Sequence, residues 1–169
     1  MIGTALSRHL LNQGYDVIIL SRNPVQTASV YKTSSSQNSF RPSGNIFYAK
    51  WDTDKKMIDP QAIAKADHIV HLAGEGVAKK RWTKKRKEEI RLSRTQSSQL
   101  LFSCLSSQTN KVKSVITASA IGWYGPDQGK VFTEDDPSSN DFLGQTCKAW
   151  EESIDKVASL GKRLVKMRL

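Results

Sequence analysis

The chain has 169 residues, a length that suits one domain of ordinary size. Hydrophobic residues make up 38% and charged residues 25% of it, which is typical of a soluble globular protein and excludes a disordered chain. No apolar run could span a bilayer and the amino end carries no signal peptide, so we expect a cytoplasmic protein without membrane contact. Cys104 and Cys147 lie far apart, which indicates a reducing compartment and argues against disulfides or a zinc site.

The net charge of +10 comes mainly from one segment. Residues 79–87 contain seven basic and no acidic side chains, so the rest of the chain carries only +3. A basic run with Trp82 inside it could bind a nucleic-acid backbone. A charged run is more often a solvated face, and we keep nucleic-acid binding as the lesser alternative.

Helices and strands are predicted to alternate along the chain. In chain order we expect a helix around 6–11, a strand over 16–20, a loop over 27–45, a strand over 46–52, a helix over 60–66, a strand over 68–74, a helix over 83–105, a strand over 114–120, a helix over 142–160 and a strand over 163–169. The short apolar runs suit strands buried in a parallel sheet, and Gly14 and Gly161 suit helix ends.

The alternation indicates an α/β fold, a parallel sheet with helices on both faces. In this architecture ligands bind beyond the carboxyl ends of the strands. The turns at residues 21–22, 72–76 and 118–125 are therefore the candidate site. The three histidines show no metal-ligand spacing with Cys or acidic residues, so we expect no metal site.

Three blocks resemble the atypical epimerase-like branch of the extended short-chain dehydrogenases/reductases. Residues 74–101 match the pattern GE-x-x-A-x-x-RW-T, followed by K-x-x-I-x-x-SR. SAIGWYG at 119–125 resembles the family's SA-x-G-x-YG turn, and FLGQTCKAWEE at 142–152 resembles its FL-x-x-x-C-x-x-WE helix. The resemblance covers nearly the whole chain but only about the first half of a family member.

The resemblance implies an NAD(P)-binding domain over residues 1–169 with a Rossmann-like, doubly wound parallel sheet that is incomplete. In the family, a GxxGxxG turn joins a first, central strand to the helix that opens this chain. Met1-Ile2-Gly3 matches only the end of that turn, with Gly3 as its last glycine and a cofactor contact. Neither that strand nor the carboxyl-terminal substrate-binding part lies in the chain, so we expect lower stability than in an intact relative and weak cofactor binding.

Ser21 and Arg22 stand at the end of the second strand of the expected Rossmann unit. An acidic residue there would bind the ribose 2′-hydroxyl of NAD, whereas an Arg can pair with the 2′-phosphate of NADP. We therefore expect NADP (NADPH) as the cofactor, with Arg22 on the phosphate and Ser21 as a hydrogen-bond donor. The alternative is a solvated Arg at a strand end.

The resemblance implies further cofactor contacts at the next turn and helix. Leu72, Ala73 and Gly74 resemble the turn that follows the fourth strand and lies along the cofactor's phosphates and nicotinamide ribose. Glu89 and Arg94 match family positions on the helix that faces the cofactor, and a solvated helix face is their alternative.

The catalytic residues of the wider superfamily are a Ser or Thr after the fifth strand and a Tyr-x-x-x-Lys pair on the next helix. Ser119 matches the first of these. If Glu151 is aligned with the Glu that often follows the pair, Leu143 and Cys147 occupy the Tyr and Lys positions, as in the atypical branch itself. Neither can transfer a proton in the usual way, and Tyr124 is a candidate substitute acid.

Two functions follow from this resemblance. The first is an NADP-binding, epimerase/dehydratase-like oxidoreductase or isomerase that acts on a small, nucleotide-sugar-like substrate by an altered mechanism. The second is a non-catalytic NADP-binding regulatory protein. Neither the substrate nor the oligomeric state follows from the residues.

Overall fold

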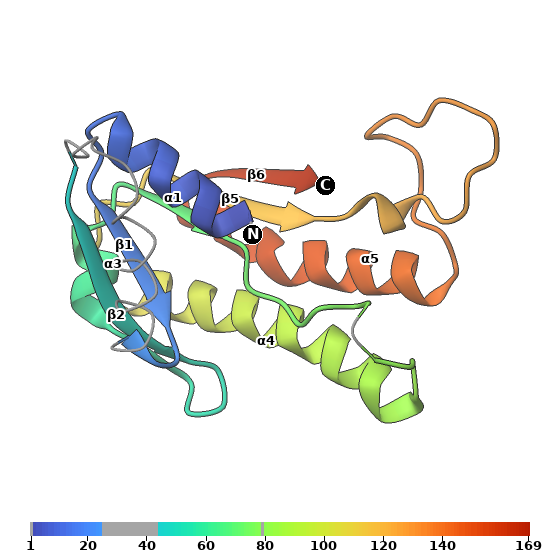
Figure 1. Ribbon diagram of the computed structural model, residues 1–169, viewed down its shortest axis with the longest axis horizontal. Coiled ribbons are helices and arrows are strands. Elements are labelled where there is room, and N and C mark those ends of the chain that lie inside the picture. The colour runs from blue at the N-terminus through green and yellow to red at the C-terminus, as the bar shows by residue number, and fades with distance from the viewer. Residues whose placement is uncertain (1, 25–43, 79) are drawn as a thin grey trace, which may run out of the picture. The chain divides into compact units, whose positions relative to one another are not determined.

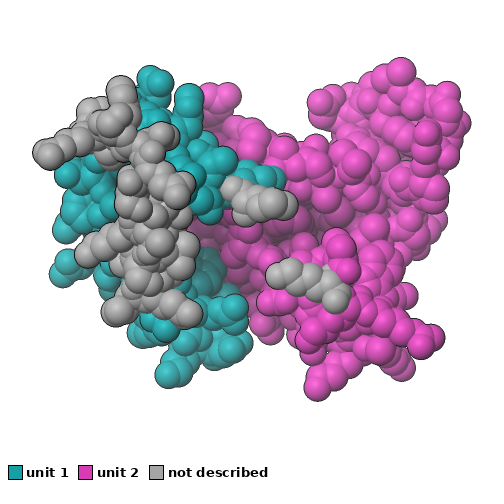
Figure 2. Space-filling view, in the orientation of Figure 1, with its two compact units in different colours: residues 1–66 teal, residues 67–169 magenta. Residues whose placement is uncertain are grey.

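The computed structural model describes residues 2–24, 44–78 and 80–169 (Figure 1). The chain divides into two compact units, residues 1–66 and 67–169, which Figure 2 shows in separate colours. None of the described helices is long and apolar enough to cross a lipid bilayer.

The described residues of the first unit form two helices and a small sheet. Its elements are α1 (Ile2–Asn12), β1 (Val17–Ser21), β2 (Ile46–Asp52), β3 (Met57–Ile58) and α3 (Pro60–Lys65). β1 and β2 pair in parallel, and the two-residue strand β3 pairs with β2 in the antiparallel sense. Most of the predicted loop at 27–45 lies outside the described residues.

Local interactions of the first unit explain where its elements begin and end. Gly14 has φ of 84°, a left-handed conformation that stops α1 at little cost because glycine has no Cβ. The Asp52 carboxylate accepts hydrogen bonds from the backbone N–H groups of Asp54 and Lys55 and so folds the turn between β2 and β3. Asp59 caps α3 by accepting from the backbone N–H of Gln61.

The second unit contains a parallel sheet and two long helices. Its elements are β4 (His68–His71), α4 (Lys84–Ser107), β5 (Ser114–Ser119), the 3₁₀ helix η1 (Ile121–Trp123), α5 (Phe142–Asp155), the 3₁₀ helix η2 (Lys156–Leu160) and β6 (Arg163–Arg168). β5 lies in the middle of the sheet and pairs in parallel with β4 and β6. α4 and α5 run side by side (Figure 1).

The core of the second unit forms where one face of α4 meets α5 and β5. Ile90 and Leu101 of α4, Val115 of β5 and Ile154 of α5 are all fully buried. The side chains of Thr83 and Asp141 cap the amino ends of α4 and α5 by accepting from the backbone N–H groups of Arg86 and Gly144. These caps place the first turn of each helix directly after a loop at the carboxyl edge of the sheet.

The expected α/β, Rossmann-like fold with an incomplete parallel sheet is confirmed. Each predicted helix and strand is present, although β4 ends at His71 and the last turns of the predicted helix at 142–160 are 3₁₀. Among the described residues, β1 has β2 as its only strand partner and β4 has only β5. The antiparallel strand β3 was not predicted.

Candidate functional site

The turn after β4 places a guanidinium group directly against the main chain of Gly74. A Cβ added to Gly74 would lie 3.2 Å from Cζ of Arg94, so no larger residue fits there without displacing that side chain. Arg94 donates to the carbonyl oxygen of Ile90 at 3.0 Å, and its Cζ lies 4.9 Å from the ring centroid of Trp150. Burial lowers the pKa of Arg94. No carboxylate of the described residues lies within ion-pair distance of this cation.

Arg86 is a buried cation within the basic run, unlike its described neighbours there. Its side chain is 9% exposed and pairs with the carboxylates of Glu75, at 3.2 Å, and Glu89, at 3.0 Å. It also donates to the carbonyl oxygen of Gly76 at 2.7 Å. The backbone N–H of Glu75 donates to Ser93 Oγ at 3.0 Å. These bonds fix the turn after β4 against the first three turns of α4.

Glu89, expected to contact the cofactor, therefore holds Arg86 in the described structure. Its side chain is still 44% exposed and can be reached by a ligand. Leu72 and Ala73 lie in the irregular segment between β4 and Gly74 and are half-buried.

At the end of β1, Ser21 and Arg22 form a short polar turn. Ser21 Oγ accepts from the backbone N–H of Asn23 at 3.1 Å, and Lys50 donates to the Arg22 carbonyl oxygen. The Arg22 side chain is exposed at the carboxyl end of its strand, the position expected for a 2′-phosphate contact. Gly3 lies in the first turn of α1, where its carbonyl oxygen accepts from Ser7 Oγ at 2.7 Å.

Ser119 lies at the end of β5 and is directed at a buried carboxylate. Its hydroxyl donates to Oε1 of Glu151 at 2.6 Å, and the two residues are 4% and 3% exposed. Arg168 of β6 donates to both oxygens of the same carboxylate, at 3.0 and 3.2 Å. Burial raises the pKa of Glu151, but the bonds from Arg168 and Ser119 outweigh that effect and lower it. The Ser119 proton therefore belongs to an internal network in the described structure.

Tyr124 is joined to the same network through Arg168. Nη1 of Arg168 donates to the Tyr124 hydroxyl oxygen at 2.9 Å, and the guanidinium lies 3.8 Å from the centroid of the Trp123 ring. The Tyr124 oxygen thus accepts from a fixed cation and keeps its own proton for another acceptor. The side chain borders a cavity of about 320 Å³ that is otherwise lined by residues of the loop 128–140.

Leu143 and Cys147, the residues expected at the places of the Tyr-x-x-x-Lys pair, pack against the turn after β5. A Cβ on Gly122 would lie 3.2 Å from Cβ of Leu143 and 3.9 Å from Sγ of Cys147, so these side chains pack on the turn after β5. The Cys147 thiol is 4% exposed and donates to the Ala120 carbonyl oxygen at 3.7 Å. Burial raises its pKa, which opposes a role as a nucleophile.

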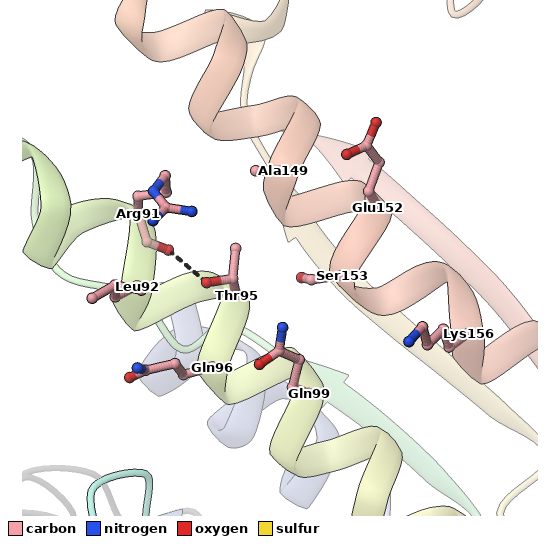
Figure 3. Close-up of a pocket in the computed structure, with 9 residues that line it drawn as sticks. All are labelled: Arg91, Leu92, Thr95, Gln96, Gln99, Ala149, Glu152, Ser153 and Lys156. Atoms are coloured by element: carbon pink, nitrogen blue, oxygen red, sulfur yellow. Dashed lines mark hydrogen bonds between the residues drawn. The ribbon is translucent and has the colours of Figure 1, made fainter.

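A polar groove lies between the facing sides of α4 and α5 (Figure 3). It has a volume of about 440 Å³ and includes the side chains of Gln96, Gln99, Glu152 and Lys156. None of the candidate catalytic or cofactor-binding residues lines it. Among the described residues, no three His, Cys, Asp or Glu side chains gather as metal ligands would.

The structure joins Ser119 to Tyr124 through Arg168 and Glu151, and it brings Gly74 onto Arg94. The sequence motifs gave no sign of Arg168, because its partners lie 17 and 44 residues away in the sequence. They also gave no sign of the special place of Arg86 in the basic run. The helical spacing of Arg86 relative to the apolar residues of α4 could have indicated that it is buried.

The family model of the NAD-dependent epimerase/dehydratase family matches residues 1–149. The chain belongs to this family. An epimerase family protein of Bacillus subtilis, YfhF, is 32% identical over 168 residues, which are 99% of the chain and 50% of that protein. An epimerase family protein of Mycobacterium bovis, Mb2239, is 31% identical over 118 residues, 70% of the chain and 38% of that protein.

Solved structures of similar fold include the human epimerase family protein SDR39U1 (isoform 2) with NADPH, at 23% identity and a TM-score of 0.68. The chain aligns over 99% of its length with 50% of that protein. UDP-glucose 4-epimerase from Bifidobacterium longum, in complex with NAD⁺ and UDP, has 21% identity and a TM-score of 0.74, with 99% and 49% covered. The chain thus spans half or less of the length of each of these four relatives. The expected epimerase-like, short-chain dehydrogenase/reductase membership is confirmed.

Proposed function

We propose that this member of the epimerase/dehydratase family binds NADPH as part of an oxidoreductase or isomerase that acts on a nucleotide-sugar-like substrate. The observation that carries the proposal is the turn after β4, where the lack of a side chain at Gly74 lets the guanidinium of Arg94 lie against the main chain. Among the described residues Arg94 has no carboxylate in ion-pair contact, and an Arg without a carboxylate partner suits a phosphate.

Two observations support NADPH in particular. The exposed Arg22 side chain at the end of β1 suits a 2′-phosphate, and no acidic residue stands at that strand end to bind a free 2′-hydroxyl. A relative of similar fold, human SDR39U1, has been solved with NADPH, whereas UDP-glucose 4-epimerase from B. longum has been solved with NAD⁺. Bound NADPH would supply the hydride, and the chain's residues would bind and orient it.

For proton transfer we propose Tyr124 as the acid, since its side chain borders a cavity and its hydroxyl oxygen accepts from Arg168. Ser119 would act through Glu151 and Arg168 by fixing the cation that binds Tyr124. This arrangement would replace the Tyr-x-x-x-Lys pair, at whose places the resemblance puts Leu143 and Cys147. Two proteins of similar fold support a nucleotide sugar as the class of substrate. UDP-glucose 4-epimerase from B. longum has been solved with UDP, and MoeE5 has been solved with UDP-glucuronic acid.

Calorimetric titration with NADPH and NADH tests the cofactor proposal. We expect Arg94→Gln to weaken the binding of both cofactors by roughly tenfold or more, because one charge-assisted bond to a phosphate is lost. Arg22→Asp should weaken the binding of NADPH but not the binding of NADH. Arg91→Gln is the matched control, because Arg91 lies on the same helix and pairs with Glu88. Equal affinities in all four proteins would contradict the proposal.

A further inference from the structure

Several surface cations lie at and just before the start of α4 without acidic partners among the described residues. Lys80, Arg81, Lys84 and Lys85 are exposed and Lys87 is half-buried, and none of these five forms an ion pair among the described residues. We call these five residues the basic surface. Such a concentration of one sign of charge produces a positive potential that extends beyond the surface.

The carboxylates closest to the basic surface in the sequence pair with other cations and leave only one net negative charge to offset it, because the single charge of Arg86 faces two carboxylates. Glu75 and Glu89 both pair with the buried Arg86, and Glu88 pairs with Arg91. The first turn of α4 contains no acidic residue, although that end of a helix carries a partial positive charge and favours acidic side chains. The basic surface is therefore electrostatically unfavourable in the free protein and would be relieved by an anion.

The basic surface is attached to the turn that carries Gly74. Arg86, between Lys85 and Lys87, donates to the Gly76 carbonyl oxygen at 2.7 Å, and Glu75 is bonded to both Arg86 and Ser93. The Trp82 indole donates to the carbonyl oxygen of Val77 at 2.8 Å. These bonds keep the cations beside the turn on which the proposed phosphate contact depends.

We propose that the basic surface steers phosphate-bearing ligands to the turn after β4 and thereby raises their rate of association. The inference deepens the proposed function and rests on it. A steering surface acts over a Debye length, about 30 Å at 0.01 M and about 8 Å at 0.15 M ionic strength, so it needs no contact with the bound ligand. NADPH carries a phosphate that NADH lacks, so the surface should favour NADPH more strongly.

Stopped-flow measurement of NADPH binding, followed by its fluorescence, tests the proposal. The test variant is Lys80→Gln/Lys84→Gln/Lys85→Gln. The matched control is Lys111→Gln/Lys113→Gln/Lys156→Gln, which removes the same charge from residues that precede β5 and β6 in the sequence. We expect the test variant to associate about three- to tenfold more slowly than the wild type at low salt, with an unchanged dissociation rate. This difference in association rate should vanish at high salt. The association rate of the control variant should fall much less than that of the test variant.

Three results would overturn the inference. Equal association rates in the two variants would show that only net charge matters. A faster dissociation of the test variant would show direct contacts instead of steering. Tight binding of a single-stranded oligonucleotide at physiological salt, lost only in the test variant while NADPH kinetics are unchanged, would assign the basic surface to nucleic acid. If the wild type binds no NADPH at any salt concentration, the proposed function itself fails and the inference falls with it.

Discussion

His71 should make the stability of the protein depend on pH between about 4 and 6.5. The side chain stands at the end of β4 and is 5% exposed. Its Nε2 lies 3.2 and 3.4 Å from the hydroxyl oxygens of Ser97 and Ser98, which are fully buried. Burial lowers the pKa of His71 to about 4 from its ordinary 6.5, because the charged ring would lose its hydration.

The sign follows from linkage between protonation and folding. Between pH 4 and 6.5 the unfolded chain binds a proton at this histidine that the folded chain does not, so stability falls as the pH falls. Above pH 6.5 His71 is neutral in both the folded and the unfolded chain, so it no longer lowers the free energy of unfolding. The shift from 6.5 to about 4 corresponds to about 3 kcal/mol at 1.36 kcal/mol per pKa unit.

Urea unfolding at a series of pH values from 4 to 7.5 measures this effect. His71→Gln keeps a polar group that can bond to the two serines but cannot titrate, so its free energy of unfolding should fall less steeply with pH than that of the wild type. His9→Gln, at an exposed position of α1, is the matched control and should follow the wild type. A constant difference between wild type and His71→Gln across this range would refute the reasoning.

Three further predictions concern the network, the loop and the thiol of the second unit. Glu151→Gln should destabilise the fold by about 2 kcal/mol in urea unfolding because Arg168 and Ser119 lose a charged hydrogen-bond partner, whereas Glu88→Gln at an exposed pair should cost less than about 1 kcal/mol. Gly125→Ala should lower the melting temperature more than Gly129→Ala: both glycines have positive φ, but only the first Cβ would meet a side chain, at 2.7 Å. Cys147 should resist thiol reagents in the native state and react after unfolding, and rapid native labelling would contradict its burial.

The sequence predicted the regular elements well where periodicity was strong. In α4, which covers the helix predicted over 83–105, Ile90, Ser97, Leu101 and Leu105 recur at helical spacing, and all four are buried. The same spacing extends backwards to Arg86, four residues before Ile90, which explains why this cation of the basic run is buried. The high charge of residues 79–87 masks this helical spacing in the sequence.

Features that depend on distant partners could not be predicted from local patterns. A strand of two residues such as β3 has no period of its own, and the turn held by Asp52 determines its pairing. The roles of Ser119 and Tyr124 depend on Arg168, which meets them only when β5 and β6 pair in parallel. The family resemblance gave the positions of candidate residues, whereas their bonding partners came from the fold.

The central claim is that the protein binds NADPH, the nicotinamide cofactor with a 2′-phosphate. Thermal melting with NADPH, with NADH or without cofactor tests it most directly. We predict that NADPH raises the melting temperature in a concentration-dependent way and that NADH at the same concentration raises it less. A melting temperature unchanged by either cofactor, in a protein shown to be folded, would contradict the claim.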